Sequence, residues 1–471
     1  MKKTLSLLLA IALLLTSLFV FSSCNEDKEN EEKKEENTYT SDDIAMSSEN
    51  FSFTRGEVSY IFHKNYSEMK MKYADSVDMY NIDTESSLKG QIYYDDYSWF
   101  QYFADMATDY MKELLVFCEA AKADGMEITQ EEKDGIDAAL KTWTDYARDY
   151  DYKIEDLLGK YYNSDVTIDT MRSFMQKETL AMDYQSKLVS EYNFTDEELK
   201  QFVSDNADDF YFIDYLKFEI DEDDCDTPKA TADSFAAAKT PDEFLALAKD
   251  YLENVKKDKN ADTTLASCTV TGEKKKEYSD FSKWAFDGVA ENSTYIETDE
   301  VDGVYTVYML TKAPRTDDDN SKNIRILMEN VSSHNSYQDT INYLNGLIDE
   351  WKAGEATEGS FADMVIEKSD DSETAGYGGL ISSLCRFGND NSLPAELISW
   401  TFDSARKVGD TGVVKGDGCY YAVYFSGEDI PGWQINANIG LGQNRLNEDF
   451  EAKLENHPVT LNTEVINSLE G

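Results

Sequence analysis

The second half of the chain contains an internal repeat, and this repeat constrains the fold more than any other feature of the sequence. Six residues, mostly aromatic, recur in the same order 116 positions later. The first set is Trp284, Phe286, Asp287, Tyr305, Val307 and Tyr308, and the second is Trp400, Phe402, Asp403, Tyr421, Val423 and Tyr424. Upstream, Thr240 and Phe244 recur as Thr357 and Phe361 at an offset of 117, so one insertion or deletion separates the copies. The repeat predicts two domains of one fold.

Each copy has the pattern of a small α+β domain. A short strand opens it (215–220 and 324–328), one or two helices and a WxFD motif follow, and an alternating strand closes it (304–310 and 420–425). We therefore expect two α+β domains, over 210–318 and 319–430, and a C-terminal helical extension over 431–471.

The region 50–209 is predicted to be an all-α domain. Apolar residues recur there at intervals of three and four, which places them on one face of a helix. These residues are Trp99, Phe103, Met106, Tyr110, Leu114 and Phe117. Thr129 with Glu132 and Thr195 with Glu198 form capping boxes that open further helices. Such a face is typical of a helix-packing core, and a groove for unfolded chains is the alternative.

The first 23 residues have the pattern of an export signal. Lys2 and Lys3 precede an apolar run that ends in small residues and Cys24. This ending resembles the lipobox of bacterial lipoproteins, although Phe21 stands where that family has an aliphatic residue. The resemblance implies that Cys24 is lipidated and that the protein is extracytoplasmic, anchored to the outer face of the bacterial cell membrane. An ordinary signal peptide or an uncleaved anchor is the alternative.

Residues 24–49 are expected to form an acidic, disordered tether, since most of this segment has too few apolar residues to offset the entropy of ordering.

The charge of the chain excludes nucleic acid as a partner. It has 44 Lys plus Arg against 94 Asp plus Glu, a formal net charge of −50, which repels phosphate backbones.

No cofactor or metal is expected, because the phosphate-binding and dinucleotide-binding glycine motifs and the zinc motifs HExxH and CxxC are missing from the sequence. After Cys24 an odd, scattered set of cysteines remains, which we expect to be free and mostly buried thiols. They are Cys118, Cys225, Cys268, Cys385 and Cys419.

The second copy resembles the parvulin-type peptidyl-prolyl isomerases. Its NIRILM is similar to that family's R-H-I-L strand, and its SDDSETAGYGG to the S-x-D-x-x-S/T-A-x-x-G-G-D-L loop. WTFDSARKVGDTGVV and YYAVYF are similar to the F-x-x-G-x-[ST] stretch and the final strand. The first copy is a degenerate version without the Gly-Gly loop. With the helical region and lipobox ahead, nearly the whole mature chain resembles PrsA-like and SurA-like extracytoplasmic foldase lipoproteins of clostridial type.

The resemblance implies a set of catalytic residues in the second copy. Asp371 matches the family's Cys/Asp position, and Arg325 stands where its first histidine belongs. The second histidine is replaced by Tyr421 if the last strand is aligned on Tyr424 and Phe425, and by Tyr420 if it is aligned on Gly418. The Asp expected after Gly378 and Gly379 is deleted. These two glycines are expected to form a tight turn with positive φ, which would bring Asp371 to the side of the sheet that carries Tyr421.

A proline-binding pocket is implied as well. It would comprise Leu380, Leu393, Leu397 and Phe402, and for the leucines the alternative is an ordinary hydrophobic core. We expect Leu380 to lie on the same side of the sheet as Tyr421.

Two functions remain open. The first is a membrane-anchored foldase that assists secreted proteins and has peptidyl-prolyl isomerase activity in the second parvulin-like domain. The second is a catalytically inactive holdase that keeps the parvulin fold as a scaffold. Either one has unfolded or newly exported polypeptides as partners.

Overall fold

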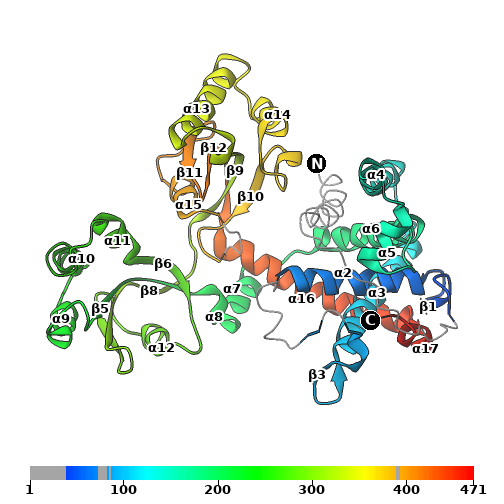
Figure 1. Ribbon diagram of the computed structural model, residues 1–471, viewed down its shortest axis with the longest axis horizontal. Helices are drawn as coiled ribbons and strands as arrows, with labels where there is room; N and C mark the ends of the chain where they lie inside the picture. Colours follow the sequence, from blue (N-terminus) through cyan, green and yellow to red (C-terminus); the bar gives the residue numbers. More distant parts are fainter. Residues whose placement is uncertain (1–38, 73–81, 84–85, 389–392, 471) are drawn as a thin grey trace. The chain divides into compact units, whose positions relative to one another are not determined.

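The computed structural model describes residues 39–72, 82–83, 86–388 and 393–470. The predicted signal and Cys24 lie outside these residues. The chain forms two compact units (Figure 1). The first unit contains residues up to Asn193 together with Gly442–Gly471, and the second is Phe194–Leu441. The structure thus has a helical region and small antiparallel sheets, as expected.

Long helices build the first unit. They are α2 (Arg55–Lys72), α3 (Trp99–Ala123), α4 (Gln130–Asp149), α5 (Ile154–Tyr162) and α6 (Ile168–Glu191). The predicted capping box of Thr129 and Glu132 opens α4, and a second one, Ser98 with Gln101, opens α3. Their apolar faces share one core, which includes Phe62, Phe103, Phe117, Trp143 and Phe174.

A three-stranded sheet joins the two ends of the described chain within this unit. β1 (Ile44–Ser47) pairs with β2 (Ser52–Thr54) and with β13 (Thr460–Leu461). Ala45 and Met46 of β1 are fully buried in the core. The expected tether over 24–49 therefore does not extend to its predicted end, because a short apolar stretch inside an acidic segment forms a core strand.

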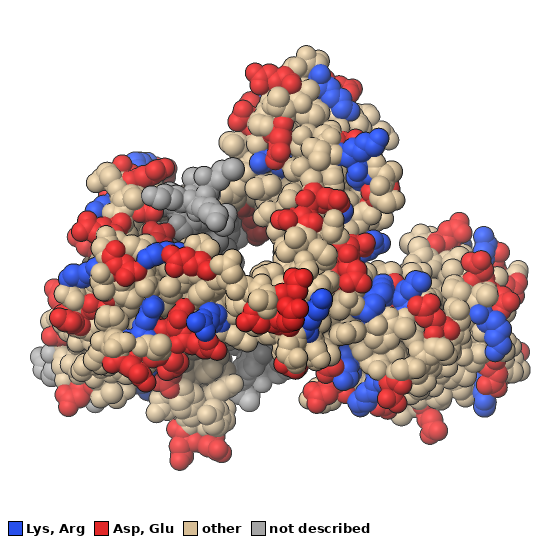
Figure 2. Space-filling model, turned by 180° about the vertical axis from the view of Figure 1, so that it is seen from behind, with Lys and Arg blue, Asp and Glu red and all other residues tan. Residues whose placement is uncertain are grey.

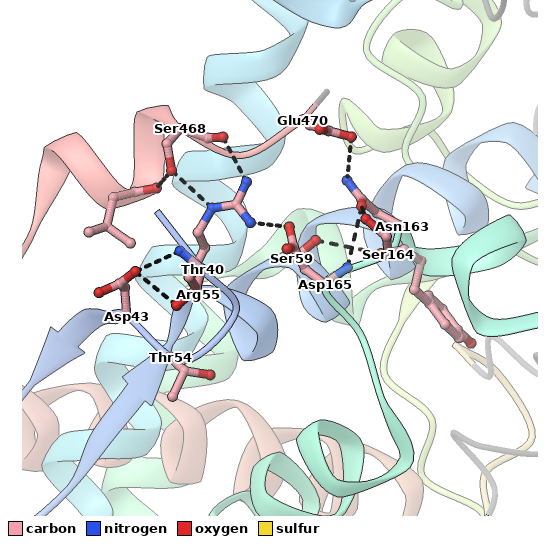
Figure 3. Close-up of polar contacts among 12 residues, drawn as sticks. Thr40, Asp43, Thr54, Arg55, Ser59, Asn163, Ser164, Asp165, Ser468 and Glu470 are labelled. Atoms are coloured by element: carbon pink, nitrogen blue, oxygen red, sulfur yellow. Dashed lines mark hydrogen bonds and ion pairs between the residues drawn. The ribbon is translucent and has the colours of Figure 1, made fainter. Parts of the chain in front are cut away.

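The C-terminal segment belongs to the same core and is more than a helical extension. α16 (Gly432–Asn456) contributes Leu446, and α17 (Thr463–Asn467) contributes Val465 and Ile466. The buried Arg55 fixes the last residues, since its Nε donates to Ser468 Oγ at 2.9 Å and its Nη2 to the Ser468 carbonyl at 2.8 Å (Figure 3). Arg55 also forms an ion pair with Asp165.

A β-hairpin interrupts the helical region, which differs from the all-α prediction. Its strands are β3 (Ile92–Tyr94) and β4 (Tyr97–Ser98). Asp95 between them has a φ of 47°, a conformation that Asp tolerates in hairpin turns.

Two short helices open the second unit and pack onto the start of α16, which closes this unit in sequence. α7 (Asp196–Asp205) and α8 (Ala207–Phe210) pack through Leu199, Val203 and Phe210 onto Ala437 of α16. The predicted boundary at 209 assigns α7 and α8 to the first domain, whereas the structure assigns them to the second unit. The sequence does not show this, because a helical pattern does not reveal which partner its apolar face packs against.

The rest of the second unit comprises two α+β modules. The elements of the first module are β5 (Phe212–Asp221), α9 (Pro228–Ala236), α10 (Pro241–Asp250), η4 (Tyr251–Lys256), α11 (Ala261–Ser267), β6 (Thr269–Lys274), α12 (Asp280–Phe286), β7 (Thr294–Asp299) and β8 (Val304–Arg315). Those of the second are β9 (Asn320–Asn330), η5 (Val331–Ser333), α13 (Tyr337–Ala353), α14 (Glu358–Lys368), η6 (Ala375–Tyr377), β10 (Leu380–Leu384), α15 (Ala395–Thr401), β11 (Thr411–Lys415) and β12 (Cys419–Pro431).

The strand order is the same in both modules, as the repeat predicts. It is β6-β5-β8-β7 in the first sheet and β10-β9-β12-β11 in the second. Thr240 and Thr357 are also equivalent, since each caps the helix that places Phe244 or Phe361 in the core.

The 116-residue offset does not hold on the closing strands. Val307 packs with α9 and α10, whereas its sequence partner Val423 packs on the opposite sheet face, with α15. A shift of one residue exchanges the faces of a strand. The sequence repeat and the structural repeat are therefore one residue out of step on this strand.

No helix in the described part of the chain is long and apolar enough to cross a membrane. Acidic side chains are spread over the face that Figure 2 shows, with basic side chains between them. The five described cysteines are free, as predicted, and four are buried while Cys225 is partly exposed.

Candidate functional site

The Gly-Gly loop of the second module has the predicted conformation. Gly378 and Gly379 both have a φ of +66°, which non-glycine residues rarely adopt. The Gly379 carbonyl accepts a hydrogen bond from the Ile326 N–H of β9 at 2.9 Å. A Cβ on Gly379 would lie 2.0 Å from the Ile326 carbonyl oxygen, so glycine is also required by this close approach.

Asp371 lies at the start of this loop and is engaged within it. Its Oδ1 accepts from the Glu373 N–H at 3.0 Å, and its Oδ2 from the Thr374 hydroxyl at 2.5 Å. Both bonds are local, so this carboxylate stabilises the loop conformation.

Tyr421 lies on β12, opposite Met328 of β9 and Val414 of β11. Burial raises the pKa of its phenol, and a hydrogen bond with the Cys419 thiol and the nearby charge of Asp371 raise it further. The phenol therefore stays protonated at neutral pH and can donate a hydrogen bond. Asp371 and Tyr421 are the two predicted catalytic residues that the structure brings near each other.

Arg325 does not join them, because it lies on the opposite face of the sheet. Its neighbours Ile324 and Ile326 pack in the same cluster as Tyr421, and side chains alternate along a strand. The guanidinium instead pairs with Glu358 at 2.9 Å and donates to the carbonyls of Tyr377 and Gly378 at 3.1 and 3.0 Å. Arg325 thus stabilises the Gly-Gly turn from the sheet face opposite Tyr421.

The predicted proline pocket is divided between the same two faces. Leu380 pairs with Arg325 across the strands and is 40% exposed on the Arg325 face, which corrects the expectation that it lies beside Tyr421. Leu393, Leu397 and Phe402 do belong to the Tyr421 cluster. Leu397 is fully buried and Phe402 nearly so, as in an ordinary core.

A second candidate site lies on the first unit, where aromatic side chains are exposed. We call Tyr93 and Tyr94 of the hairpin with Tyr102, Met106 and Tyr110 of α3 the aromatic strip. Tyr102, Met106 and Tyr110 are four residues apart and lie along one helix face. The Tyr93 ring lies 5.0 Å from that of Tyr102, which joins the hairpin to the helix.

The aromatic strip is accessible yet firmly supported. Tyr94 is 58% exposed, Met106 43% and Tyr110 36%. The Tyr93 ring packs 4.3 Å from the buried Trp99, and Tyr97 donates to Asp105 Oδ2 at 2.5 Å. The Tyr110 hydroxyl donates to the buried Glu178 at 2.6 Å. Burial raises the pKa of Glu178, and this hydrogen bond partly offsets the increase.

Sequence reasoning identified only part of this strip. In the predicted face of α3, Trp99, Phe103, Leu114 and Phe117 are buried, as expected for a core. Met106 and Tyr110 are exposed and belong with Tyr102 to a second stripe of α3, which the three-and-four spacing alone does not distinguish from the first. The hairpin tyrosines were missed, although two aspartates between tyrosines in YYDDY are a turn signal.

No group of three or more His, Cys, Asp or Glu side chains that could hold a metal ion lies among the residues with assigned positions.

No protein-family model matches the chain. No curated protein matches it either. Several solved structures do match the chain. A peptidylprolyl isomerase (PrsA) from Bacillus anthracis is 11% identical, with 58% of this chain and 94% of that chain covered and a TM-score of 0.21. The foldase protein PrsA from Streptococcus pneumoniae is 17% identical, with 50% and 81% covered and a TM-score of 0.21.

A third match comes from a study of PEB4 and Cj1289, two SurA-like chaperones of Campylobacter jejuni. It is 11% identical, with 57% and 81% covered and a TM-score of 0.15. Over about half of its length, the chain is similar to PrsA foldases and SurA-like chaperones.

Proposed function

We propose that this protein is an extracytoplasmic chaperone that binds unfolded or newly exported polypeptides through the aromatic strip and is anchored to the membrane by lipid on Cys24. The exposed strip is the observation that carries the proposal. Aromatic side chains held on a rigid scaffold provide a large contact area at a low entropic cost, and apolar segments of unfolded chains are their natural partners.

The hairpin adds backbone groups to this surface. In the described part of the chain, β3 pairs with β4 and no other strand. Its second edge therefore has free N–H and C=O groups, which an extended client segment can pair with. Backbone pairing is independent of the client's sequence, which suits a chaperone with many clients.

The acidic surface supports the same role. A net charge of −50 keeps the protein soluble and keeps separate complexes apart by repulsion. Exposed aspartates, Asp95, Asp96, Asp105 and Asp109, adjoin strip residues in the sequence, and their charge would repel the acidic surface of a second complex.

We further propose that 210–318 and 319–430 are parvulin-like domains that serve as scaffold. Isomerisation of an X-Pro bond has a barrier of about 18–20 kcal/mol, and lowering it requires groups that converge on one cleft. Arg325 and Leu380 lie on the sheet face opposite Tyr421, and Leu397 is in the core. The proximity of Asp371 and Tyr421 favours the second candidate, an isomerase with a tyrosine as hydrogen-bond donor.

Suppression of client aggregation tests the main proposal. A chemically denatured client enzyme is diluted with increasing amounts of the protein, and light scattering is recorded. Replacing Tyr94 and Met106 by Ser together should raise the half-suppressing concentration at least about tenfold, since each buried side chain contributes about 1.5–3 kcal/mol.

Tyr152→Ser is the matched control. Tyr152 is on the same unit and is about as exposed as Tyr94, at 56% against 58%, but it lies outside the strip. Equal suppression by the strip variant and the wild type would contradict the proposal.

A further inference from the structure

The first unit contains a pocket of about 490 Å³ that is separate from the aromatic strip. Its walls come from the segment after β1, the end of α3 with the following loop, the start of α4, and α6. The volume is within the range of about 300–1,000 Å³ typical of ligand sites. The pocket is large enough for a few side chains of a polypeptide.

Apolar side chains form one part of the lining. Phe51, Met126, Ile128 and Leu180 line the pocket, and Leu180 is largely buried. This part can accept an apolar group and remove its surface from water.

Two lysines in the lining have no carboxylate partner. Among the residues whose positions are described, neither Lys122 nor Lys133 forms an ion pair. Lys177 also lines the pocket but pairs with Glu57 at 2.7 Å. Glu127 is the one carboxylate in the lining. In a chain with more than twice as many acids as bases, a pocket with two lysines that form no ion pair in the described structure is unusual.

The position of Lys122 is fixed by a hydrogen-bond network that ends on the buried Glu119. Its Nζ donates to Asn50 Oδ1 at 2.6 Å and lies 5.8 Å from the centroid of the Phe51 ring. Asn50 in turn donates from its N–H and its Nδ2 to the buried Glu119, at 2.5 and 2.7 Å. The ammonium is thus held beside the apolar lining before any ligand arrives, which reduces the entropy lost on binding.

We propose that this pocket binds a carboxylate of a polypeptide next to an apolar side chain, with the carboxylate on Lys122 and Lys133 and the apolar group against Phe51, Met126 and Ile128. The carboxylate can come from a glutamate or aspartate side chain or from the chain terminus, since all present the same two oxygens to an ammonium. This inference rests on the proposed chaperone function, because that function makes polypeptides the ligand. The site would favour acidic, apolar client segments over basic ones.

Fluorescence anisotropy of labelled peptides with the full chain tests this proposal. The first probe is a pentapeptide of Leu and Phe around one Glu, with its C-terminus amidated. The second has Gln in place of Glu, and the third is the Gln peptide with a free terminal carboxylate. We expect the Glu peptide to bind about tenfold more tightly than the Gln peptide, as for one charged hydrogen bond. If the third probe binds as tightly as the Glu peptide, the pocket accepts any carboxylate. If it binds as weakly as the amidated Gln peptide, the pocket accepts only side-chain carboxylates.

Lys122→Gln and Lys133→Gln should each remove most of this preference, while Lys141→Gln, on the exposed side of α4 and paired with Asp145, should leave it unchanged. Raising the salt concentration should reduce the preference as well, since free charges near the surface are screened. Equal binding of the Glu and Gln peptides, or a preference that survives both lysine substitutions, overturns the proposal.

The result is independent of the aggregation assay. A carboxylate preference that disappears with the lysine variants supports the site even if the aromatic strip proves inactive toward clients.

Discussion

The guanidinium of Arg55 donates two hydrogen bonds to Ser468, which lies 413 residues later in the chain. The same group pairs with Asp165, and Arg55 is only 1% exposed. One buried cation therefore joins the start of α2, the segment before α6 and the C-terminal segment (Figure 3).

Arg55→Met should lower the free energy of unfolding of the first unit by about 3 kcal/mol, because it leaves Asp165 charged and without its partner. Urea unfolding followed by circular dichroism measures this change. Arg148→Met is the control, since Arg148 is exposed and solvent screens its ion pair with Asp145, so its removal should change the stability little. Equal effects of the two substitutions would show that the buried network is not stabilising.

Gly379→Ala should destabilise the second module by more than about 2 kcal/mol, because its φ of +66° strains any L-residue and the new Cβ would meet the Ile326 carbonyl. Gly376→Ala in the same loop has open space around the new methyl group and should be tolerated. Thermal unfolding of both variants compares them. A stable Gly379 variant would mean that the turn adopts another conformation.

His63 should make the first unit less stable in mild acid. Burial lowers the pKa of its imidazole to about 4, against an ordinary value of 6.5, although a backbone hydrogen bond with Glu470 opposes the shift. Its Nε2 has no hydrogen-bond partner among the described residues. Because the folded pKa is the lower one, the unfolded chain binds more protons between these values. The contribution of His63 is complete above pH 6.5 and is lost as the pH falls toward 4.

Between pH 7 and pH 5 this loss amounts to about 2 kcal/mol. Urea unfolding of the wild type and of His63→Gln at both pH values isolates it from the carboxylates, which both proteins share. An identical pH dependence in the two proteins would refute the assignment.

Cys24→Ala should release the protein from the membrane or leave its signal uncleaved, because in the proposed lipoprotein both the lipid and the cleavage site depend on that thiol. Membrane fractionation and the mass of the N-terminal peptide report the two outcomes. Membrane attachment with a normally processed N-terminus would contradict the lipoprotein assignment.

Asp371→Ala should leave aggregation suppression unchanged and cost about 1 kcal/mol of stability, since the carboxylate makes two local hydrogen bonds in the loop. Neither protein should accelerate the proline-limited phase of a refolding client. If the wild type accelerates this phase and the variant does not, the isomerase alternative is correct.

The sequence predicted those features that depend on local backbone requirements. Gly378 and Gly379 adopt positive φ because no other residue fits there easily, and Thr129 caps α4 because its neighbour Glu132 completes the capping box. The shared strand order also followed from the repeat.

The errors concern which face a side chain occupies. Family resemblance aligned Arg325 with a catalytic histidine, yet its side chain points to the other side of the sheet, because one residue decides the face of a strand. In the same way, Val307 and Val423 match in sequence and face opposite layers. Ala45 and Met46 appeared to belong to a tether, since four residues of β1 have too little pattern to show that a distant strand, β13, pairs with them.

The first unit is made from both ends of the described chain, with residues 194–441 between its two parts. During synthesis, β1 is made long before β13, its partner in the sheet, has been translated. The second unit is continuous in sequence and can fold as soon as it emerges, whereas closing the first requires contacts over more than 400 residues, for which loop-closure entropy slows folding. A chain that stalls or is cut before its last thirty or so residues would therefore lack a finished scaffold for the aromatic strip, so that the proposed client-binding surface would form only once the whole chain is present.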